Sequence, residues 1–332
     1  MDAIDLHAHY MPQRFLRLAS SGEEWHGIRL EHDDRSRRFG VAGPYRFPVR
    51  PRDSWSVAQR LLEMDAMEIG MQVVSGAPQL YNYHLPADVA LATCRDTNDE
   101  IAEMVGCYPD RFKGIAILPM QDVSAAIAEM ERTIASLGFS GVMIGDHVNE
   151  RGYDEVEFEA FFKEAERLGA LVLFHQGCET LISPHISRYR LPDTLGGPAE
   201  RSLTYGTLVS SGLMDRVPDL KVCLAHGGGH IAYGIGRMDR AWEFRPEARV
   251  SLHDAPGRYL RRFYYDCLTH SERALRLLLD TVGIDRVVLG SCWPSDLGME
   301  WPVAWVKSLE TLSHEEKHHI LTRNAADLLG IS

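Results

Sequence analysis

The chain has 332 residues, 45% of them hydrophobic and 25% charged, so it can bury a large core without help from disulfides. Its formal net charge of −12 argues against nucleic acid as a partner, although a locally positive cleft can still receive an anionic substrate. The first residues lack the basic region and the apolar stretch that are typical of a signal peptide. No apolar run approaches the roughly 20 residues of a membrane helix, and the six cysteines include no CxxC pair. We therefore expect a cytoplasmic protein with free thiols and no membrane partner.

The chain alternates between short apolar runs and longer segments with helical periodicity. The apolar runs are, in chain order, Ile4–His9, Met71–Ser75, Phe112–Leu118, Gly141–Gly145, Leu171–His175, Lys221–His226, Phe263–Asp266 and Val287–Gly290. Most of them are apolar at consecutive positions, which is typical of strands buried on both faces of a parallel sheet.

Helical patterns lie between several of these runs. In Asp122–Ala135 the apolar residues recur every three or four positions, and Asp122 is a suitable N-cap. Val156–Leu168 and Ala274–Val282 show comparable patterns, and one more helix is expected from about His314. Eight strands that alternate with helices predict an α/β fold, specifically one (β/α)8 TIM barrel domain over residues 1–332.

Two long segments interrupt this alternation, one after the first strand and one after the fifth. Residues 10–55 mix arginine, glycine, proline and aromatic residues, and residues 176–199 contain several glycines and prolines. Both segments predict irregular insertions that distort the barrel. Both insertions follow a strand, so both are expected on the C-terminal face, where barrel active sites are built.

Four histidines stand at the ends of predicted strands. His7 and His9 end the first strand, and side chains two residues apart on a strand point to the same side. His175 and His226 each close an apolar run, where an unpaired imidazole is costly to bury. A His-x-His pair alone is weak evidence, but three strands that end in histidine indicate a metal site. Three histidine ligands also leave an open position for water or substrate.

Motifs with a family character run along nearly the whole chain. They are Ile4-Asp-Leu-His-Ala-His9, Glu63-Met-Asp65, Leu118-Pro-Met-Gln121, Phe174-His175, His226-Gly-Gly-Gly229, Gly236-Arg237-Met-Asp-Arg-Ala-Trp242 and Gly290-Ser-Cys-Trp-Pro294. With these motifs the chain resembles the amidohydrolase superfamily, in the branch that contains 2-amino-3-carboxymuconate 6-semialdehyde decarboxylase. The resemblance implies one divalent metal ion, zinc or alternatively manganese, and non-oxidative decarboxylation of a small unsaturated or aromatic carboxylic acid.

The resemblance also implies roles for individual residues. By position, His7, His9 and His175 are metal ligands, and His226 is the acid/base group beside the metal. The predicted fourth strand ends at Asp146 without a lysine, which disfavours a carbamylated lysine bridging two metals and supports a single ion.

Cys292 departs from the family pattern, because relatives carry at this position an aspartate that binds the metal or moves a proton. Three explanations stay open. The Cys292 thiolate can replace the carboxylate as a metal ligand, or the site can be a weakened or deliberately altered one. In the third explanation, the protein no longer catalyses the reaction of the family. Our prediction places Cys292 in the site as a metal ligand and catalytic residue. Asp296, on the following loop, is a minority alternative.

Three arginines are candidates for holding a substrate carboxylate, since the guanidinium fork matches that group. The resemblance implies this role for Arg237, in some relatives across a dimer interface, and thus predicts a homodimer. A family arginine after the first strand corresponds to either Arg46 or Arg50, and the alignment does not choose between them.

Together these residues predict a metal-dependent decarboxylase that takes a small carboxylic acid as its substrate. His226 transfers protons, and the metal polarises a substrate oxygen or activates water. One alternative is a metal-dependent hydrolase or hydratase of a small acid. The other is a binding protein in which Cys292 has ended catalysis.

Overall fold

The core of the molecule is a ring of parallel strands. The computed structural model describes residues 2–178, 180 and 188–331. Two parallel sheets, with strand orders β1-β5-β6 and β12-β11-β10-β9-β8-β7, make up the ring. The strands are β1 (Ala3–Tyr10), β5 (Ile69–Gly76), β6 (Phe112–Gly114), β7 (Ala116–Ile117), β8 (Gly141–Ile144), β9 (Leu171–Phe174), β10 (Lys221–Leu224), β11 (Phe263–Asp266) and β12 (Val287–Val288).

Backbone hydrogen bonds join the two sheets at both seams. β6 and β7 are one strand interrupted at Ile115, whose N–H donates to the carbonyl of Val74 in β5 (3.0 Å). At the other seam the segment after β12 pairs with β1, because Leu6 N–H donates to Leu289 O (2.9 Å) and Cys292 N–H donates to His7 O (2.7 Å). The predicted eight-strand TIM barrel is thus confirmed, with every predicted strand in its place.

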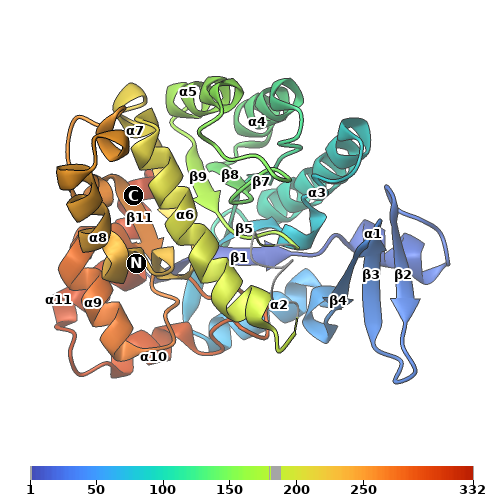
Figure 1. Ribbon diagram of the computed structural model, residues 1–332. Helices are drawn as coiled ribbons and strands as arrows, with labels where there is room; N and C mark the ends of the chain where they lie inside the picture. Colours follow the sequence, from blue (N-terminus) through green and yellow to red (C-terminus); the bar gives the residue numbers. More distant parts are fainter. Residues whose placement is uncertain (1, 179, 181–187, 332) are drawn as a thin grey trace.

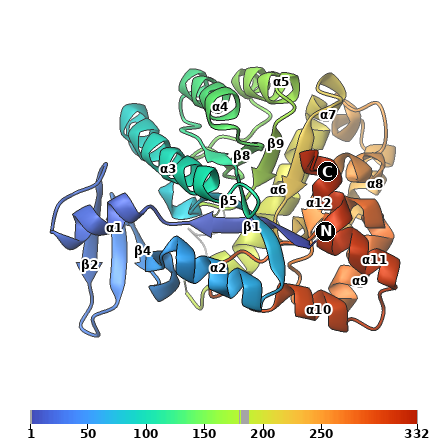
Figure 2. The ribbon, with the colours of Figure 1, turned by 180° about the vertical axis from the view of Figure 1, so that it is seen from behind.

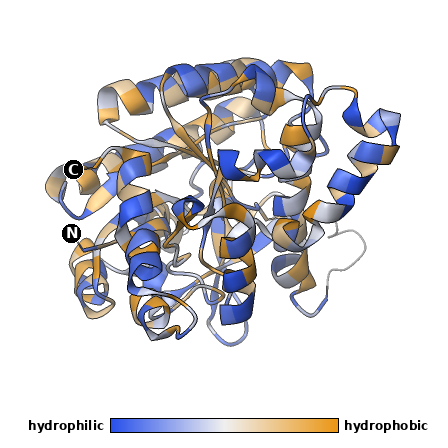
Figure 3. Cartoon of the chain, turned by 90° about the vertical axis from the view of Figure 1, so that its left-hand side faces the viewer, coloured by the Kyte–Doolittle hydropathy of each residue, from blue (hydrophilic) through white to orange (hydrophobic). Residues whose placement is uncertain are grey.

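Helices surround the ring on its outer side (Figures 1 and 2). They are α2 (Val57–Ala66), α3 (Ala87–Cys107), α4 (Val123–Leu137), α5 (Glu159–Arg167), α6 (Gly197–Ser210), α7 (Leu213–Arg216), α8 (Ile231–Phe244), α9 (Glu272–Val282), α10 (Pro302–Ser308), α11 (His314–His318) and α12 (Asn324–Leu329). The Asp122 side chain caps α4, as predicted, by accepting from the N–H of Ala125 (3.0 Å). Figure 3 shows hydrophilic and hydrophobic residues together on the outer helices, as expected for helices that bury one face only.

The segment after β1 is more regular than predicted. It contains α1 (Gln13–Ser20) and an antiparallel sheet of β2 (Ile28–His32), β3 (Arg38–Ala42) and β4 (Tyr45–Val49), which projects beside the barrel in Figures 1 and 2. The prediction of an irregular insertion was wrong here. Two of the strands carry the alternation of a half-covered antiparallel sheet, as in Ile28-Arg-Leu-Glu31 and Tyr45-Arg-Phe-Pro-Val49, but each strand is only five residues long.

The insertion after β9 is described in part. Residues 179 and 181–187 of the predicted 176–199 segment lie outside the described residues, and a π-helical turn over Pro192–Gly196 leads into α6. The two ends of the chain lie close together in both ribbon views, where the C-terminal helices pack beside β1. Within the described residues, no helix is both long and apolar enough to cross a membrane.

Candidate metal centre and substrate cavity

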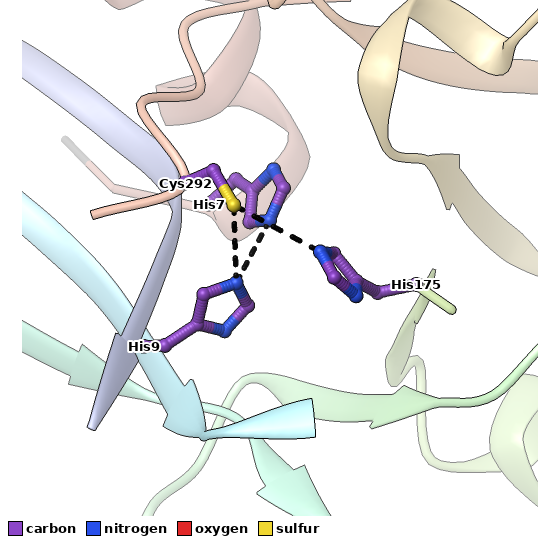
Figure 4. A group of neighbouring side chains, drawn as sticks. All are labelled: His7, His9, His175 and Cys292. Carbon is purple, nitrogen blue, oxygen red and sulfur yellow. Dashed lines mark hydrogen bonds between the residues drawn. The ribbon is translucent and has the colours of Figure 1, made fainter. Parts of the chain in front are cut away.

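Four buried side chains converge at the C-terminal end of the barrel. His7 and His9 extend from β1, His175 follows β9, and Cys292 lies after β12; none is more than 5% exposed. Their candidate ligand atoms all lie within 4.8 Å of one another. Figure 4 shows the rings of His7, His9 and His175 turned toward a common centre, with the Cys292 sulfur on one side of it.

Each histidine has a polar partner on the nitrogen that faces away from this centre. Nδ1 of His7 lies 2.7 Å from a carboxylate oxygen of Asp266. Nδ1 of His9 lies 3.1 Å from the hydroxyl oxygen of Ser75, and Nδ1 of His175 lies 2.8 Å from the backbone carbonyl oxygen of Gln176. A carboxylate and a carbonyl only accept, so Nδ1 of His7 and of His175 must donate. When these rings are neutral, their Nε2 lone pairs face the centre, as metal-ligating histidines require.

The electrostatics of the cluster attract positive charge. Burial lowers the pKa of His175 to about 3 and holds the pKa of His9 well below its ordinary value, so both rings are neutral. Burial also opposes a charge on His7, but the Cys292 sulfur and the Asp266 carboxylate outweigh it and raise the pKa of His7 to about 10. These residues therefore stabilise a positive charge at the centre, which either a proton on His7 or a bound metal ion can provide.

The spacing of the donor atoms fits a four-coordinate metal. Ordinary zinc bond lengths and tetrahedral angles separate ligand atoms by about 3.3 Å for two nitrogens and about 3.6 Å for nitrogen and sulfur. Here the Nε2 atoms of His7 and His9 are 3.1 Å apart, and the Cys292 sulfur lies 3.6 Å from His9 Nε2 and 3.9 Å from His175 Nε2. The residues present fit a single divalent ion.

Asp266, at the end of β11, links the cluster to the turn that carries His226. One carboxylate oxygen accepts from His7, and the other accepts from the backbone N–H groups of Gly227 (2.8 Å) and Leu268 (3.1 Å). The contact between Asp266 and His7 requires a glycine at position 290. A Cβ there would lie 2.7 Å from the Asp266 Cβ and 3.0 Å from the His7 Cβ. From the sequence, Asp266 ends the predicted strand Phe263–Asp266, which made it a candidate for supporting the metal ligands without binding the ion itself.

His226 lies beside the cluster and is not one of its four ligand-bearing residues. Its ring centroid is 4.9 Å from that of His175 and 5.4 Å from that of His7. The residue adopts φ +56°, a left-handed conformation uncommon outside glycine, as does Cys292. Burial, and then the neighbouring His175 and His7, hold the pKa of His226 well below its ordinary value, so the ring is neutral.

A cavity of about 620 Å³ opens from this cluster, lined in part by His9, His175, His226 and Cys292. The size suits a small organic acid. The cavity also brings together residues that are distant in sequence, including Arg46, Arg50, Gln176 and Asp296.

The three predicted carboxylate anchors occupy different surroundings. Arg46 is 45% exposed and stacks on the ring of Phe39 at 3.6 Å, whereas Arg50 is 21% exposed and its Nη2 lies 3.3 Å from Asp296. Arg237 is exposed on α8 and does not line the cavity of its own chain. Asp296 lines the cavity but lies outside the four-residue cluster, on the loop where it was expected.

The family model described as amidohydrolase matches residues 4–331 of the chain. The chain is 32% identical, over 330 residues, to 2-amino-3-carboxymuconate-6-semialdehyde decarboxylase from Dictyostelium discoideum. The aligned region covers 99% of this chain and 91% of that protein.

Solved structures share this fold. The 5-carboxyvanillate decarboxylase from Sphingomonas paucimobilis superposes with a TM-score of 0.83 at 26% identity, covering 99% of each chain. The dihydroxybenzoic acid decarboxylase from Polaromonas sp. JS666, which holds manganese and 2-nitroresorcinol, gives the same TM-score at 23% identity, covering 99% of this chain and 97% of that one. The chain therefore belongs to the amidohydrolase family, in the branch that contains 2-amino-3-carboxymuconate-6-semialdehyde decarboxylase.

Proposed function

We propose that this chain is a metal-dependent, non-oxidative decarboxylase that removes CO₂ from a small unsaturated or aromatic carboxylic acid. The observation that carries the proposal is the three-histidine cluster with a neutral His226 beside it, inside a cavity that also holds arginine. The related decarboxylases support the same reaction class.

The proposed metal ligands are His7, His9, His175 and Cys292, and the proposed ion is zinc. A thiolate among the donors favours zinc over manganese, because manganese prefers carboxylate, carbonyl and water oxygens. When bound, the ion supplies a Lewis acid that polarises a substrate oxygen.

His226 moves the proton that the reaction needs. Decarboxylation breaks the bond between the substrate carbon and its carboxylate, and a proton must take the place of the departing CO₂ on that carbon. The neutral imidazole of His226 borders the cavity, where it can collect a proton and deliver it to this carbon. Asp266 positions this group through the N–H of Gly227, the next residue.

Arg50 is the better candidate for anchoring a substrate carboxylate within the same chain. Its guanidinium Nε is buried without a hydrogen-bond partner in the described part of the chain, and the residue lines the cavity. Arg46 is already engaged, because it stacks on Phe39 and faces Glu31 at 3.8 Å.

We also propose a cytoplasmic homodimer built from single-domain chains. All six cysteines are free of disulfides, as expected in a reducing compartment. Helix α8 exposes Tyr233 (87% exposed) and Phe244 (56% exposed) on the same helix as Arg237, and exposed aromatic residues are typical of interfaces. In this arrangement Arg237 reaches the cavity of the partner subunit.

The reaction class is tested by incubating the metal-loaded protein with 2,6-dihydroxybenzoate and 5-carboxyvanillate in water labelled with heavy oxygen. A decarboxylase releases one CO₂ per acid consumed, and its organic product gains no oxygen from solvent. Labelled oxygen in an organic product formed without CO₂ would instead identify a hydratase or hydrolase.

Cys292 is expected to bind the metal through its sulfur. In the holo protein it should resist alkylation, and it should react once the metal is chelated, because coordination shields the thiolate. Peptide mass spectrometry can follow Cys292 beside Cys178, an exposed cysteine that lines the same cavity and should alkylate equally in both states.

Variants at Cys292 sharpen this test. The cobalt-substituted protein should show a thiolate-to-cobalt charge-transfer band that Cys292→Ser abolishes. Cys292→Asp should keep the metal, lose the band and raise decarboxylase activity, because it restores the acidic residue of the family. Equal alkylation of Cys292 with and without metal, and no band in the parent protein, would place the sulfur outside the coordination sphere.

Arg237 is expected to act in the partner's site. The variants Arg237→Ala and His226→Asn should each be nearly inactive as homodimers. Mixed dimers of the two should regain activity, because one of their two cavities combines an intact His226 with an intact Arg237 from the partner. Chromatography and a rate assay after subunit exchange measure both properties. A monomeric protein, or mixtures without regained activity, would contradict the proposed role.

A further inference from the structure

Cys292 holds an uncommon backbone conformation at the metal centre. Its φ of +56° lies in the left-handed region, which a residue with a Cβ occupies at a cost and keeps only where its surroundings hold it there. The sulfur lies 3.6 Å from Nε2 of His9 and 3.9 Å from Nε2 of His175 (Figure 4). The turn therefore requires anchors, and several of them hold Trp293, the next residue.

The indole of Trp293 is clamped by two residues of α2. Its Nε1 donates to Oε2 of Glu63 (2.7 Å), and the guanidinium of Arg60 lies over the ring, 4.2 Å from the centroid. Arg60 and Glu63 are three residues apart on one helix, so their side chains lie on the same face. The other carboxylate oxygen of Glu63 pairs with Arg52 at 2.7 Å, which fixes the carboxylate in turn. The loss of Glu63 would take from this buried indole the acceptor of its N–H.

Backbone hydrogen bonds connect the clamped residue to the metal ligands. The N–H of Trp293 donates to Oγ of Ser291 (3.0 Å), and its carbonyl accepts from the N–H of His9 (2.7 Å). Between them, the N–H of Cys292 donates to the carbonyl of His7 (2.7 Å). The turn thus runs along β1, and the position of the indole determines where the sulfur lies relative to the histidines of that strand.

We propose that Glu63 is a positioning residue of the metal centre: by holding the indole of Trp293, it keeps the sulfur of Cys292 directed at the metal. This inference rests on the proposed role of Cys292 as a metal ligand. It also gives a task to the motif Glu63-Met-Asp65, whose first residue contacts the motif Gly290-Ser-Cys-Trp-Pro294 across 230 positions of sequence.

The experiment measures zinc affinity with and without the sulfur, so it does not depend on turnover. Competition with a chromophoric zinc chelator gives the Kd of the parent protein, of Glu63→Leu, of Cys292→Ser and of the double variant. Leucine keeps the helix propensity of position 63 but cannot accept a hydrogen bond, and Glu63 is 16% exposed, so the barrel core is left intact. The control is Asp65→Leu, which removes another carboxylate of α2, one that pairs with Arg111 (2.7 Å).

Glu63→Leu should weaken zinc binding by roughly 10-fold, at the low end of the loss that follows removal of a group that orients a metal ligand. In the Cys292→Ser background the same substitution should leave the Kd nearly unchanged, because no thiolate remains to be positioned. In the cobalt-substituted protein, Glu63→Leu should also lower the thiolate-to-cobalt band per bound ion. Asp65→Leu should match the parent protein in both measurements.

A role of Glu63 in fold stability alone would lower zinc affinity equally in both backgrounds, and this result would overturn the inference. Equal affinity of the parent protein and Glu63→Leu, an unchanged cobalt band, or equal affinity of the parent protein and Cys292→Ser would overturn it as well. The decarboxylase proposal is judged separately by CO₂ release. A sulfur-dependent effect of Glu63 in a protein that releases no CO₂ would contradict the reaction and support the positioning role. CO₂ release without such an effect would do the reverse.

Discussion

His7→Ala and His175→Ala are each expected to abolish tight metal binding and, with it, the decarboxylase activity. Each substitution removes one of the three imidazoles that converge on the centre, so the ion loses a protein ligand that water has to replace. The parent protein should bind about one divalent ion per chain, as single-metal histidine sites do. Metal content after dialysis, measured by elemental analysis, reports the result.

Asp266→Asn provides a graded control for the same site. The asparagine oxygen can still accept from Gly227, but its amide nitrogen cannot accept from Nδ1 of His7. Metal affinity should therefore fall by roughly 10- to 100-fold, as is usual when the hydrogen-bond partner of a ligating histidine is lost. Two tightly bound ions in the parent protein, or full occupancy in the His7→Ala, His175→Ala double variant, would contradict the single-metal site.

His226→Asn is expected to lower turnover by roughly 10²–10⁴-fold while metal content stays at the parental level. The asparagine keeps a polar side chain at the cavity wall but cannot gain and release a proton near neutral pH. The rings of His226 and His175 are 4.9 Å apart, yet the structure gives His226 no place among the four converging ligand residues.

Two measurements on one sample separate the alternatives for His226. Elemental analysis gives the metal content, and CO₂ release under saturating substrate gives the rate. If metal and activity fall together, His226 is a ligand and not the proton carrier. If neither changes, the proton comes from another group that lines the cavity, such as Asp296, which the sequence analysis kept as an alternative.

The strand positions and the grouping of His7, His9 and His175 could be predicted from the sequence, because both depend on local pattern. Continuous apolar runs marked each barrel strand, and the histidines that close them fall at one end of the barrel once the strands are parallel. His7 and His9 point to the same side because they are two residues apart on one strand. The small antiparallel sheet of β2, β3 and β4 was not predicted, because its strands are only five residues long and lie within a segment that mixes arginine, glycine, proline and aromatic residues.

The partners of these residues were decided only by the tertiary structure. Asp266 and His7 are separated by 259 positions, and their contact exists because β11 and β1 end at the same rim and Gly290 leaves the space between them. The choice between Arg46 and Arg50 likewise depends on what each guanidinium touches after folding. Sequence periodicity reports which residues are buried along one strand or helix, whereas hydrogen-bond partners across a barrel depend on register and close packing between elements.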